Sequence, residues 1–310
     1  MSRSLSAVVC TRDRPQPIAE TVRLLLSSEG DELELIVMDQ SDGRETEAAL
    51  AQYRADSRLR YVRSTTRGKG AALNEAMALT SSSIVVCTDD DCHAPAGWVS
   101  GMTRSMHAHP EAVIIFCQVL PAPHEPSRGY IPTYEFTDSR LLSSFRDICK
   151  RGLGLGAGMA VNRDFVVSAG GFDEAFGPGG RFPSADEWNL AIRALLMGRC
   201  VYEAADVSIV HDGFRTFEQG RTHIRRDWLA VGAVCALPLR AGYLKGIILP
   251  IWLLTTRAAW PLFHDVITLR SARGLGRITA FMKGFFRGLG TPVDKKTLRY
   301  IDRRKTQRSV

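Results

Sequence analysis

Paired cysteines and a secretion signal are both missing from this sequence. Seven cysteines are scattered over 310 residues without a CxxC pair. An odd number without metal-ligand spacing argues against a disulfide framework or a structural zinc site. The N-terminus reaches charged residues after a few apolar positions, so it lacks the apolar core of a signal peptide. We therefore expect the protein to work in the cytoplasm, where thiols stay reduced.

Long apolar runs are also missing. A membrane-spanning helix needs about 20 apolar residues, whereas the uncharged runs at 228–239 and 246–256 are shorter and contain Pro238 and Pro250. The net charge of +7 lies at this same end of the chain, because residues 236–310 hold fifteen Lys and Arg against three Asp and Glu. A mildly acidic body with a basic, apolar tail indicates an anionic membrane surface as partner and no nucleic acid.

The first third of the chain alternates short apolar runs with helical patterns. Apolar runs at 5–10, 33–38, 59–62 and 84–87 are separated by stretches of helical periodicity. This alternation predicts an α/β fold with a mostly parallel sheet, in which ligands bind at the carboxyl ends of the strands. No GxGxxG follows the first run, and Ala71 stands where a phosphate loop requires Ser or Thr. Both of these nucleotide-binding motifs are therefore disfavoured.

Acidic side chains follow the fourth apolar run as the triplet Asp89, Asp90 and Asp91. Unpaired carboxylates are costly and mutually repulsive at the end of a buried strand. A divalent cation is the simplest compensation, and hard oxygen ligands select Mg²⁺ or Mn²⁺. A solvated turn before a helix near Pro95 is the alternative. Cys92 and His93 have no partner at zinc spacing, so we expect them to pack around the site.

Two later segments are candidates for the substrate site. Glycines alternate with apolar residues at 152–158, which predicts a strand approached by a ligand or backbone, or a tightly packed sheet crossing. A helix is expected at 185–197, and it begins with Asp186 and Glu187. Charge stabilisation at a helix N-terminus, worth about 0.3–1 kcal/mol, would favour acids there even without catalysis.

In this order, the motifs resemble the GT-A-type fold of glycosyltransferase family 2, a nucleotide-binding sandwich. The resemblance extends through about residue 215 and rests on residues 11–15, Asp39, residues 67–74, 88–91, 171–174, 186–190 with Arg193, and 210–211. It implies an inverting, metal-dependent transfer from a nucleotide-diphosphate sugar to an acceptor hydroxyl. The acceptor would be a saccharide, lipid-linked or other hydroxyl, in bacterial-type cell-surface glycan or glycolipid synthesis.

The resemblance also implies roles for individual residues. Those expected to bind the nucleotide sugar are Thr11, Arg12, Arg14, Asp39, Lys69, Asn74, Asp89 and Asp90, with Asp39 on the base and ribose. Asp89 and Asp91 match the outer positions of the DxD motif. Asp91, with Asp89 and His211, would therefore hold Mn²⁺ or Mg²⁺.

The catalytic base of the family is the Asp of a Glu-Asp pair at the start of a helix. Here the order is reversed, so Glu187 takes the base position and Asp186 is the alternative. The base would take the proton of the acceptor hydroxyl while the metal stabilises the departing diphosphate. A nucleotidyltransferase, which would need a Gly-rich loop after the first run, and a non-catalytic sugar-nucleotide-binding module remain open.

The chain is expected to divide into a GT-A-type domain at 1–227 and a helical, amphipathic, basic extension at 228–310. Within 278–289 apolar residues alternate with basic ones, which is typical of an interfacial helix. We expect the extension to bind the inner face of the membrane peripherally. Packing of these helices on the catalytic domain is the alternative.

Overall fold

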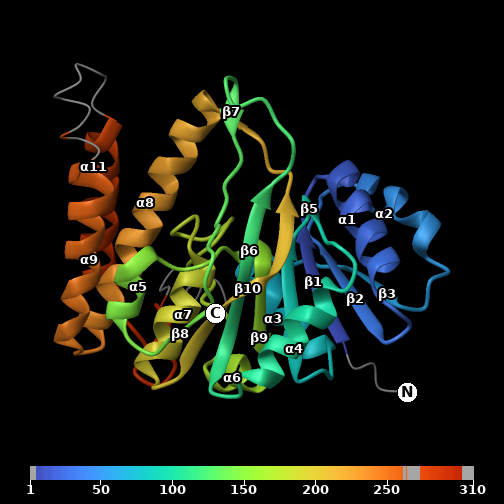
Figure 1. Cartoon of the computed structure of the whole chain (residues 1–310), viewed down its shortest axis with the longest axis horizontal. Helices are drawn as coiled ribbons and strands as arrows, with labels where there is room; N and C mark the ends of the chain where they lie inside the picture. The colour runs from blue at the N-terminus through green and yellow to red at the C-terminus, as the bar shows by residue number, and fades with distance from the viewer. Residues whose placement is uncertain (1–4, 261–262, 264–272, 302–310) are drawn as a thin grey trace, which may run out of the picture.

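A nine-stranded sheet lies at the centre of the computed structural model, which describes residues 5–260, 263 and 273–301 (Figure 1). The strand order is β3-β2-β1-β4-β9-β6-β10-β5, and β8 also pairs with β10. The strands are β1 (Leu5–Thr11), β2 (Leu33–Asp39), β3 (Leu59–Arg63), β4 (Ile84–Asp89), β5 (Cys92–His93), β6 (Ala112–Pro121), β8 (Arg140–Leu142), β9 (Met159–Asn162) and β10 (Cys200–His211). A separate pair joins β7 (Gly129–Tyr130) to β11 (Arg215–Thr216).

The register of the parallel strands aligns their polar ends. Thr11 pairs with Asp39 across β1 and β2, and Cys10 pairs with Asp89 across β1 and β4. β9 is antiparallel to both β4 and β6, but most of the paired residues lie in parallel ladders. This mixed sheet confirms the predicted fold class. The strand expected at 152–158 is wrong, because η2 (Gly156–Gly158) is a turn of 3-10 helix and β9 starts only after it.

Helices cover both faces of the sheet because successive strand residues point in opposite directions. Those in the first two thirds are α1 (Pro15–Ser28), α2 (Glu45–Ala49), η1 (Ala51–Tyr53), α3 (Lys69–Leu79), α4 (Trp98–Ala108), α5 (Phe145–Arg151), α6 (Arg163–Ser168) and α7 (Asp186–Leu196). Val9 joins a core with α1 and α4, whereas its neighbour Val8 joins the core formed with α3 and α7.

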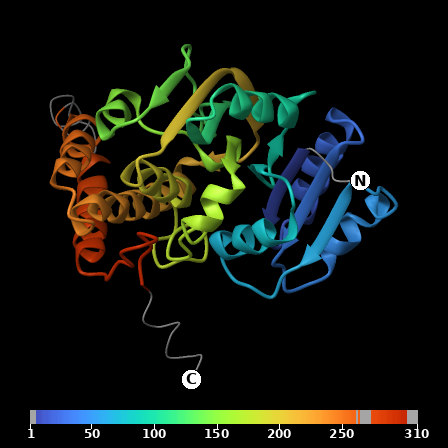
Figure 2. The same ribbon diagram turned by 90° about the horizontal axis from the view of Figure 1, so that it is seen from below.

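The last third is helical and lies at the end of the sheet away from β3 (Figure 2). Its elements are α8 (Phe217–Arg240), η3 (Leu244–Ile247), α9 (Ile248–Trp252), η4 (Leu253–Ala259), which is a π-helix, and α11 (Arg273–Leu289). The expected domain boundary at 227/228 falls inside α8 and stays a prediction. Among the residues that the structure describes, no helix is both long and apolar enough to cross a membrane.

The amphipathic helix α11 packs its apolar side against α8. Phe281 is fully buried in the core, and Gly284 and Gly288 let the two helices approach closely. A Cβ on Gly284 would stand 1.8 Å from the carbonyl oxygen of Leu229, so any other residue would push α11 away. The apolar residues expected to face a membrane at 278–289 are thus largely engaged inside the protein.

The chain beyond α11 folds back onto the segment that leads to α7. The buried Arg193 donates to the carbonyl oxygens of Thr297 and Gly171, both at 2.8 Å, and to that of Ala169. Asp173 accepts from the backbone N–H of Tyr300 at 2.7 Å. The part of the basic terminus that falls on 302–310 lies outside the described residues.

Candidate active site

The acidic triplet is neutralised by side chains from β1 and the loop after it. Arg14 Nη1 lies 2.5 Å from Asp90 Oδ1, and Arg14 Nη2 lies 2.7 Å from Asp91 Oδ2. Thr11 donates its hydroxyl to Asp90 at 2.6 Å. Burial raises the pKa of Asp90 to about 6 although Arg14 opposes this shift. Two of the residues expected to bind the nucleotide sugar are therefore in direct contact with the triplet.

Asp89 is paired with a cation from the start of α3. Lys69 Nζ lies 2.5 Å from Asp89 Oδ1, and the side chain of Lys69 is largely buried. The preceding Gly68 has φ +98°, a conformation that favours glycine, and it directs Lys69 toward the strand ends. The backbone N–H of Lys69 donates to Pro178, which ties α3 to the loop before α7. The carboxylates of the triplet are thus compensated within the chain itself.

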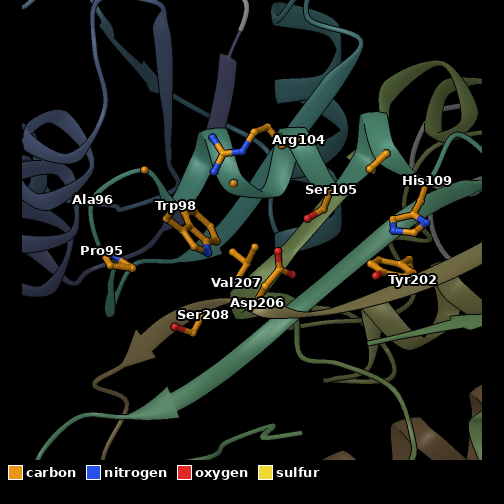
Figure 3. A pocket seen from close by; sticks show the side chains of 13 residues that line it. Pro95, Ala96, Trp98, Arg104, Ser105, His109, Tyr202, Asp206, Val207 and Ser208 are labelled. Carbon is orange, nitrogen blue, oxygen red and sulfur yellow. The ribbon is translucent and has the colours of Figure 1, made fainter. Parts of the chain in front are cut away.

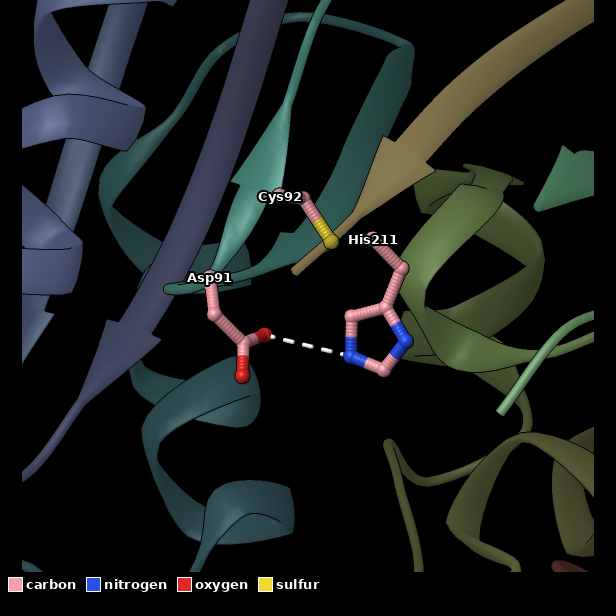
Figure 4. A group of neighbouring side chains, drawn as sticks. All are labelled: Asp91, Cys92 and His211. Carbon is pink, nitrogen blue, oxygen red and sulfur yellow. Dashed lines mark ion pairs between the residues drawn. The ribbon is translucent and has the colours of Figure 1, made fainter. Parts of the chain in front are cut away.

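Asp91, Cys92 and His211 come together where β5 pairs with the end of β10 (Figure 4). His211 Nε2 lies 3.3 Å from Asp91 Oδ1, while its Nδ1 lies 3.0 Å from the carbonyl oxygen of Pro132. The carbonyl can only accept, so Nδ1 carries a proton and Nε2 is the ring atom that faces the carboxylate. Burial raises the pKa of Cys92 far above its ordinary value, so it is a neutral thiol.

This donor set fits a divalent cation. A carboxylate oxygen and an imidazole nitrogen face each other, and the hydrogen bond to Pro132 fixes the ring as expected for a histidine ligand. Burial would raise the pKa of Asp91, but the hydrogen bond and charge of His211, together with Arg14, hold it well below its usual range. Asp91 is therefore ionised, as a metal ligand must be. Burial would lower the pKa of His211, but Asp91 raises it, so His211 would have to release its Nε2 proton when an ion binds.

The acidic pair at the start of α7, Asp186 and Glu187, lies next to Lys69, the lysine that pairs with Asp89. Gly156 lies close to both Lys69 and Glu187. A Cβ built on Gly156 would stand 3.3 Å from Lys69 Nζ and 3.7 Å from Glu187 Oε2. Asp186 is buried with one carboxylate oxygen lacking a hydrogen-bond partner, whereas Glu187 keeps partial exposure. Burial and the charge of Asp186 raise the pKa of Glu187 well above its ordinary value. Lys69 thus lies between the strand-end acids and the α7 pair.

Asp39 is fully buried at the end of β2. It accepts hydrogen bonds from Tyr61 Oη at 2.6 Å and from the backbone N–H of Ser41 at 2.8 Å. Arg12 instead pairs with Asp42 at 3.1 Å on the exposed surface. Tyr61 was missed by the sequence reasoning, because nothing in the short sequence of β3 (Leu-Arg-Tyr-Val-Arg) indicates that its hydroxyl reaches β2.

Asn74 has a mainly structural setting. Its carboxamide oxygen accepts from the backbone N–H of Phe172 at 2.7 Å, and its nitrogen donates to the carbonyl of the same residue at 3.1 Å. Asn74 holds the turn at Gly171 against α3. A Cβ built on Gly171 would collide with the Asn74 side chain. Among the expected site residues, Asn74 is thus separated from the acidic cluster, and a nucleotide contact by it stays a prediction.

A cavity of about 380 Å³ lies elsewhere, between α4 and β10 (Figure 3). Its lining includes Trp98, Arg104, Tyr202 and Asp206 and none of the expected site residues. His109 stacks on Tyr202 at one end, with 3.6 Å between ring centroids. The cavity is therefore distinct from the strand-end cluster.

Comparison with known proteins places this cluster in a family context. The family model described as "Glycosyl transferase family 2" matches residues 6–166, just over half of the chain. This range includes β1, β2 and β4 and the acidic triplet that follows them.

Solved structures share the fold at low sequence identity. A mannosyltransferase, PcManGT from Pyrobaculum calidifontis in complex with GDP-Man and Mn²⁺, is 17% identical with a TM-score of 0.62, over 93% of this chain and 88% of that chain. TarS from S. aureus in complex with UDP-GlcNAc is 14% identical with a TM-score of 0.62, over 92% and 82%. Another TarS structure is 15% identical with a TM-score of 0.55, and the match covers 77% of this chain but 43% of that one.

Proposed function

The chain belongs to glycosyl transferase family 2, and on this premise we propose that it moves a sugar from a nucleotide-diphosphate sugar to an acceptor hydroxyl with inversion at the anomeric carbon. One observation carries the proposal. Lys69 Nζ lies 2.5 Å from Asp89 Oδ1. A Cβ built on Gly156 would lie within 4 Å of both Lys69 Nζ and Glu187 Oε2. Donor-side acids and a candidate base are therefore held in one site.

The donor would lie along the strand ends. Asp39, oriented by Tyr61 and the Ser41 N–H, would receive the nucleoside, with Thr11 and Arg12 at the same pocket. Arg14 and Lys69 are the cations closest to the triplet, so they are placed to accompany the phosphate charges. PcManGT and TarS were solved with GDP-Man and UDP-GlcNAc respectively, which supports a GDP- or UDP-sugar as donor.

Asp91 and His211 would hold Mn²⁺ or Mg²⁺, and Asp89, which pairs with Lys69 in this structure, would join them as the third ligand. Bound there, a divalent cation would offset the charge that builds on the departing diphosphate. PcManGT was solved with Mn²⁺, which supports this class of ion. Arg14 and Lys69 neutralise the same acids, so the chain keeps the cluster intact by itself.

Glu187 would act as the base. It takes the proton of the acceptor hydroxyl as the acceptor oxygen forms its bond to the anomeric carbon and the bond to the diphosphate breaks. Its raised pKa makes the Glu187 carboxylate a stronger proton acceptor than an exposed glutamate. Asp186 has a buried and unpartnered oxygen and remains the alternative base. Attack opposite the leaving group in one step inverts the configuration.

We further propose a cellular setting for this reaction. The basic, apolar extension at 228–310 would hold the enzyme at the inner face of the membrane, with the catalytic domain at 1–227. There it would use a saccharide, lipid-linked or other hydroxyl acceptor in cell-surface glycan or glycolipid synthesis.

Hydrolysis and product stereochemistry test the proposal. With Mn²⁺ and a panel of UDP- and GDP-sugars, the protein is expected to release nucleoside diphosphate slowly without an acceptor. Asp91→Asn should reduce this release at least tenfold, because Asp91 would no longer hold the ion as a carboxylate. Asp164→Asn is the matched control, since the Asp164 side chain is 82% exposed on α6.

The outcomes separate the candidate functions. Binding of a nucleotide sugar without any turnover would indicate a non-catalytic module. When an acceptor is found, NMR of the product should show the anomeric configuration opposite to that of the donor. Retention would contradict the one-step mechanism with Glu187 as base.

A further inference from the structure

Large apolar side chains are exposed in a row along the last third of the chain. They are Leu244 at 76% exposure, Ile247 at 44%, Ile251 at 54%, Trp260 at 67% and Phe263 at 58%. We refer to these five residues as the exposed stripe. Exposed apolar side chains are normal when single, but a contiguous group marks an interaction surface.

The exposed stripe occupies the outward face of one helical run. Leu244, Ile247 and Ile251 follow at spacings of three and four through η3 and α9. In the π-helix η4 the exposed residues are Thr255, Thr256, Arg257 and Ala259, and the exposed Trp260 follows directly. Leu249, Leu253 and Ala258 lie on the inward face and are buried. No described element covers the outward face.

Basic side chains outnumber carboxylates around the exposed stripe, although the sequence has Asp265 shortly after Phe263 and α5, which packs on α9, carries Asp147. The described residues between Asp227 and Asp294 include no carboxylate side chain. The exposed cations there are Arg240, Lys245, Arg257, Lys283 and Arg287. Apolar and aromatic side chains surrounded by Lys and Arg are the composition of a surface that binds anionic lipid. A second copy of the same face would instead meet like charge.

The aromatic end of the exposed stripe lies near the first half of α8. Arg277 donates to the carbonyl oxygen of Arg257 at 3.2 Å, and its guanidinium stands 5.9 Å from the ring centroid of Trp228. Trp228 is on α8, which begins only six residues after His211. Figure 1 shows α8 starting beside the end of the sheet to which β10 points. The bundle therefore connects this end of the stripe to the side of the molecule that holds the site.

We propose that the exposed stripe docks on an anionic lipid bilayer, with Trp260 and Phe263 in the interface and Lys245 and Arg257 against lipid phosphates. The assignment rests on the proposed function, because the bilayer would carry a lipid-linked acceptor. α11 contributes less to this surface, since Phe281 and its apolar neighbours pack on α8 and only Leu275 and Phe286 stay exposed among its large apolar side chains that the structure describes.

Vesicle flotation of the full chain tests this assignment. Wild-type protein should float with vesicles of phosphatidylcholine and phosphatidylglycerol at low salt, and much less with phosphatidylcholine alone. The double variant Ile251→Glu, Trp260→Glu should lose at least nine tenths of the floated fraction. Val167→Glu is the control, because Val167 on α6 is likewise 54% exposed but lies on the catalytic body.

Flotation tests the lipid-binding surface, and donor hydrolysis tests the enzymatic activity independently. Acceptor-free hydrolysis of the donor should be equal in wild type and the double variant, so a loss of flotation with intact hydrolysis supports the surface. Flotation of the double variant at wild-type levels would overturn it, whatever the enzyme does. If the wild type floats poorly and instead forms dimers that the variant abolishes, the stripe binds a second copy and the assignment fails. Ile251→Ser, Trp260→Ser provides a milder pair if the charged variant unfolds.

Discussion

Lys69 is the side chain that connects the acidic triplet to the acidic pair at the start of α7. Its ammonium is bonded to Asp89 and is also attracted to Asp186 and Glu187. Burial alone would lower the pKa of Lys69, but these three carboxylates raise it well above its ordinary value. The lysine is therefore fully charged. Its position is set by Gly68 before it and by Gly156 opposite, where a larger side chain would crowd its ammonium.

Glu187→Gln is expected to remove turnover while donor binding persists. The amide cannot take a proton, so kcat should fall at least a hundredfold. In the wild type, the raised pKa of Glu187 means that the deprotonated form is lost at a higher pH than for an exposed glutamate. Activity should therefore rise with pH through that pKa, which the rate profile measures. The residual rate of Glu187→Gln should not show this rise with pH, which we call the pH limb.

Asp186→Asn distinguishes the two acids. If Glu187 is the base, this variant should keep the pH limb, shifted to lower pH because the charge of Asp186 helps to raise the pKa of Glu187. Loss of the limb in Asp186→Asn, together with its survival in Glu187→Gln, would assign the base to Asp186. Donor affinity from calorimetry controls for damage to the site.

At this scale, the sequence predicted individual residues better than their partners. Asp39 and the triplet were found because each directly follows an apolar run. The bond from Tyr61 to Asp39 and the pairing of Lys69 with Asp89 depend on strand register and loop geometry, which local patterns do not encode. The glycines at 152–158 permit close packing: Gly154 and Gly158 pack against Phe116 and Cys117, and Gly156 lies beside Lys69 and Glu187, whereas the approach of a ligand stays a prediction.

Strand β10 shows why one element was only partly predictable. The apolar pattern at 207–210 marks only the end of this strand, which begins at Cys200. Its first half contains Glu203, which is fully buried and paired with Arg140 and Arg151 at 2.6 and 2.7 Å. A charge inside a strand looks like a loop in sequence, and its two partners come from segments about 50 to 60 residues earlier in the chain. The runs without such charges, such as β1 and β4, were predicted to within two residues.

Helix α7 depends on one buried guanidinium for its attachment. Arg193→Met should reduce the free energy of unfolding by about 3 kcal/mol, since three backbone carbonyls lose a charged donor in the interior. Urea unfolding followed by circular dichroism measures the change. Arg199→Met, at an exposed position just after the same helix, should change it by less than about 0.5 kcal/mol. Equal effects of the two substitutions would show that the hydrogen bonds of Arg193 contribute nothing.

For the whole molecule, the C-terminal extension has two separate roles. α11 fills the core beside α8, and residues 291–301 hold the turn before the loop that leads to Asp186. Its composition indicated a membrane surface, but composition does not tell which apolar side chains stay outside after packing. Deleting 270–310 would therefore damage the catalytic body as well as any lipid contact. Substitutions in the exposed stripe avoid this ambiguity.

Tyr300 makes the coupling between the chain terminus and the site testable. Its hydroxyl donates to the Ala233 carbonyl at 2.8 Å on α8, and its ring contacts Phe176 and Phe182, which flank the loop before Asp186. Tyr300→Ala should lower the free energy of unfolding by about 3 kcal/mol, because it leaves a cavity among buried aromatics. It should also lower kcat, since the same ring supports the loop that positions the α7 pair. Ile301→Ala removes an adjacent, 42% exposed side chain and should leave both quantities nearly unchanged. A stable Tyr300→Ala protein with wild-type kcat would mean that the terminus only covers the site and does not hold it.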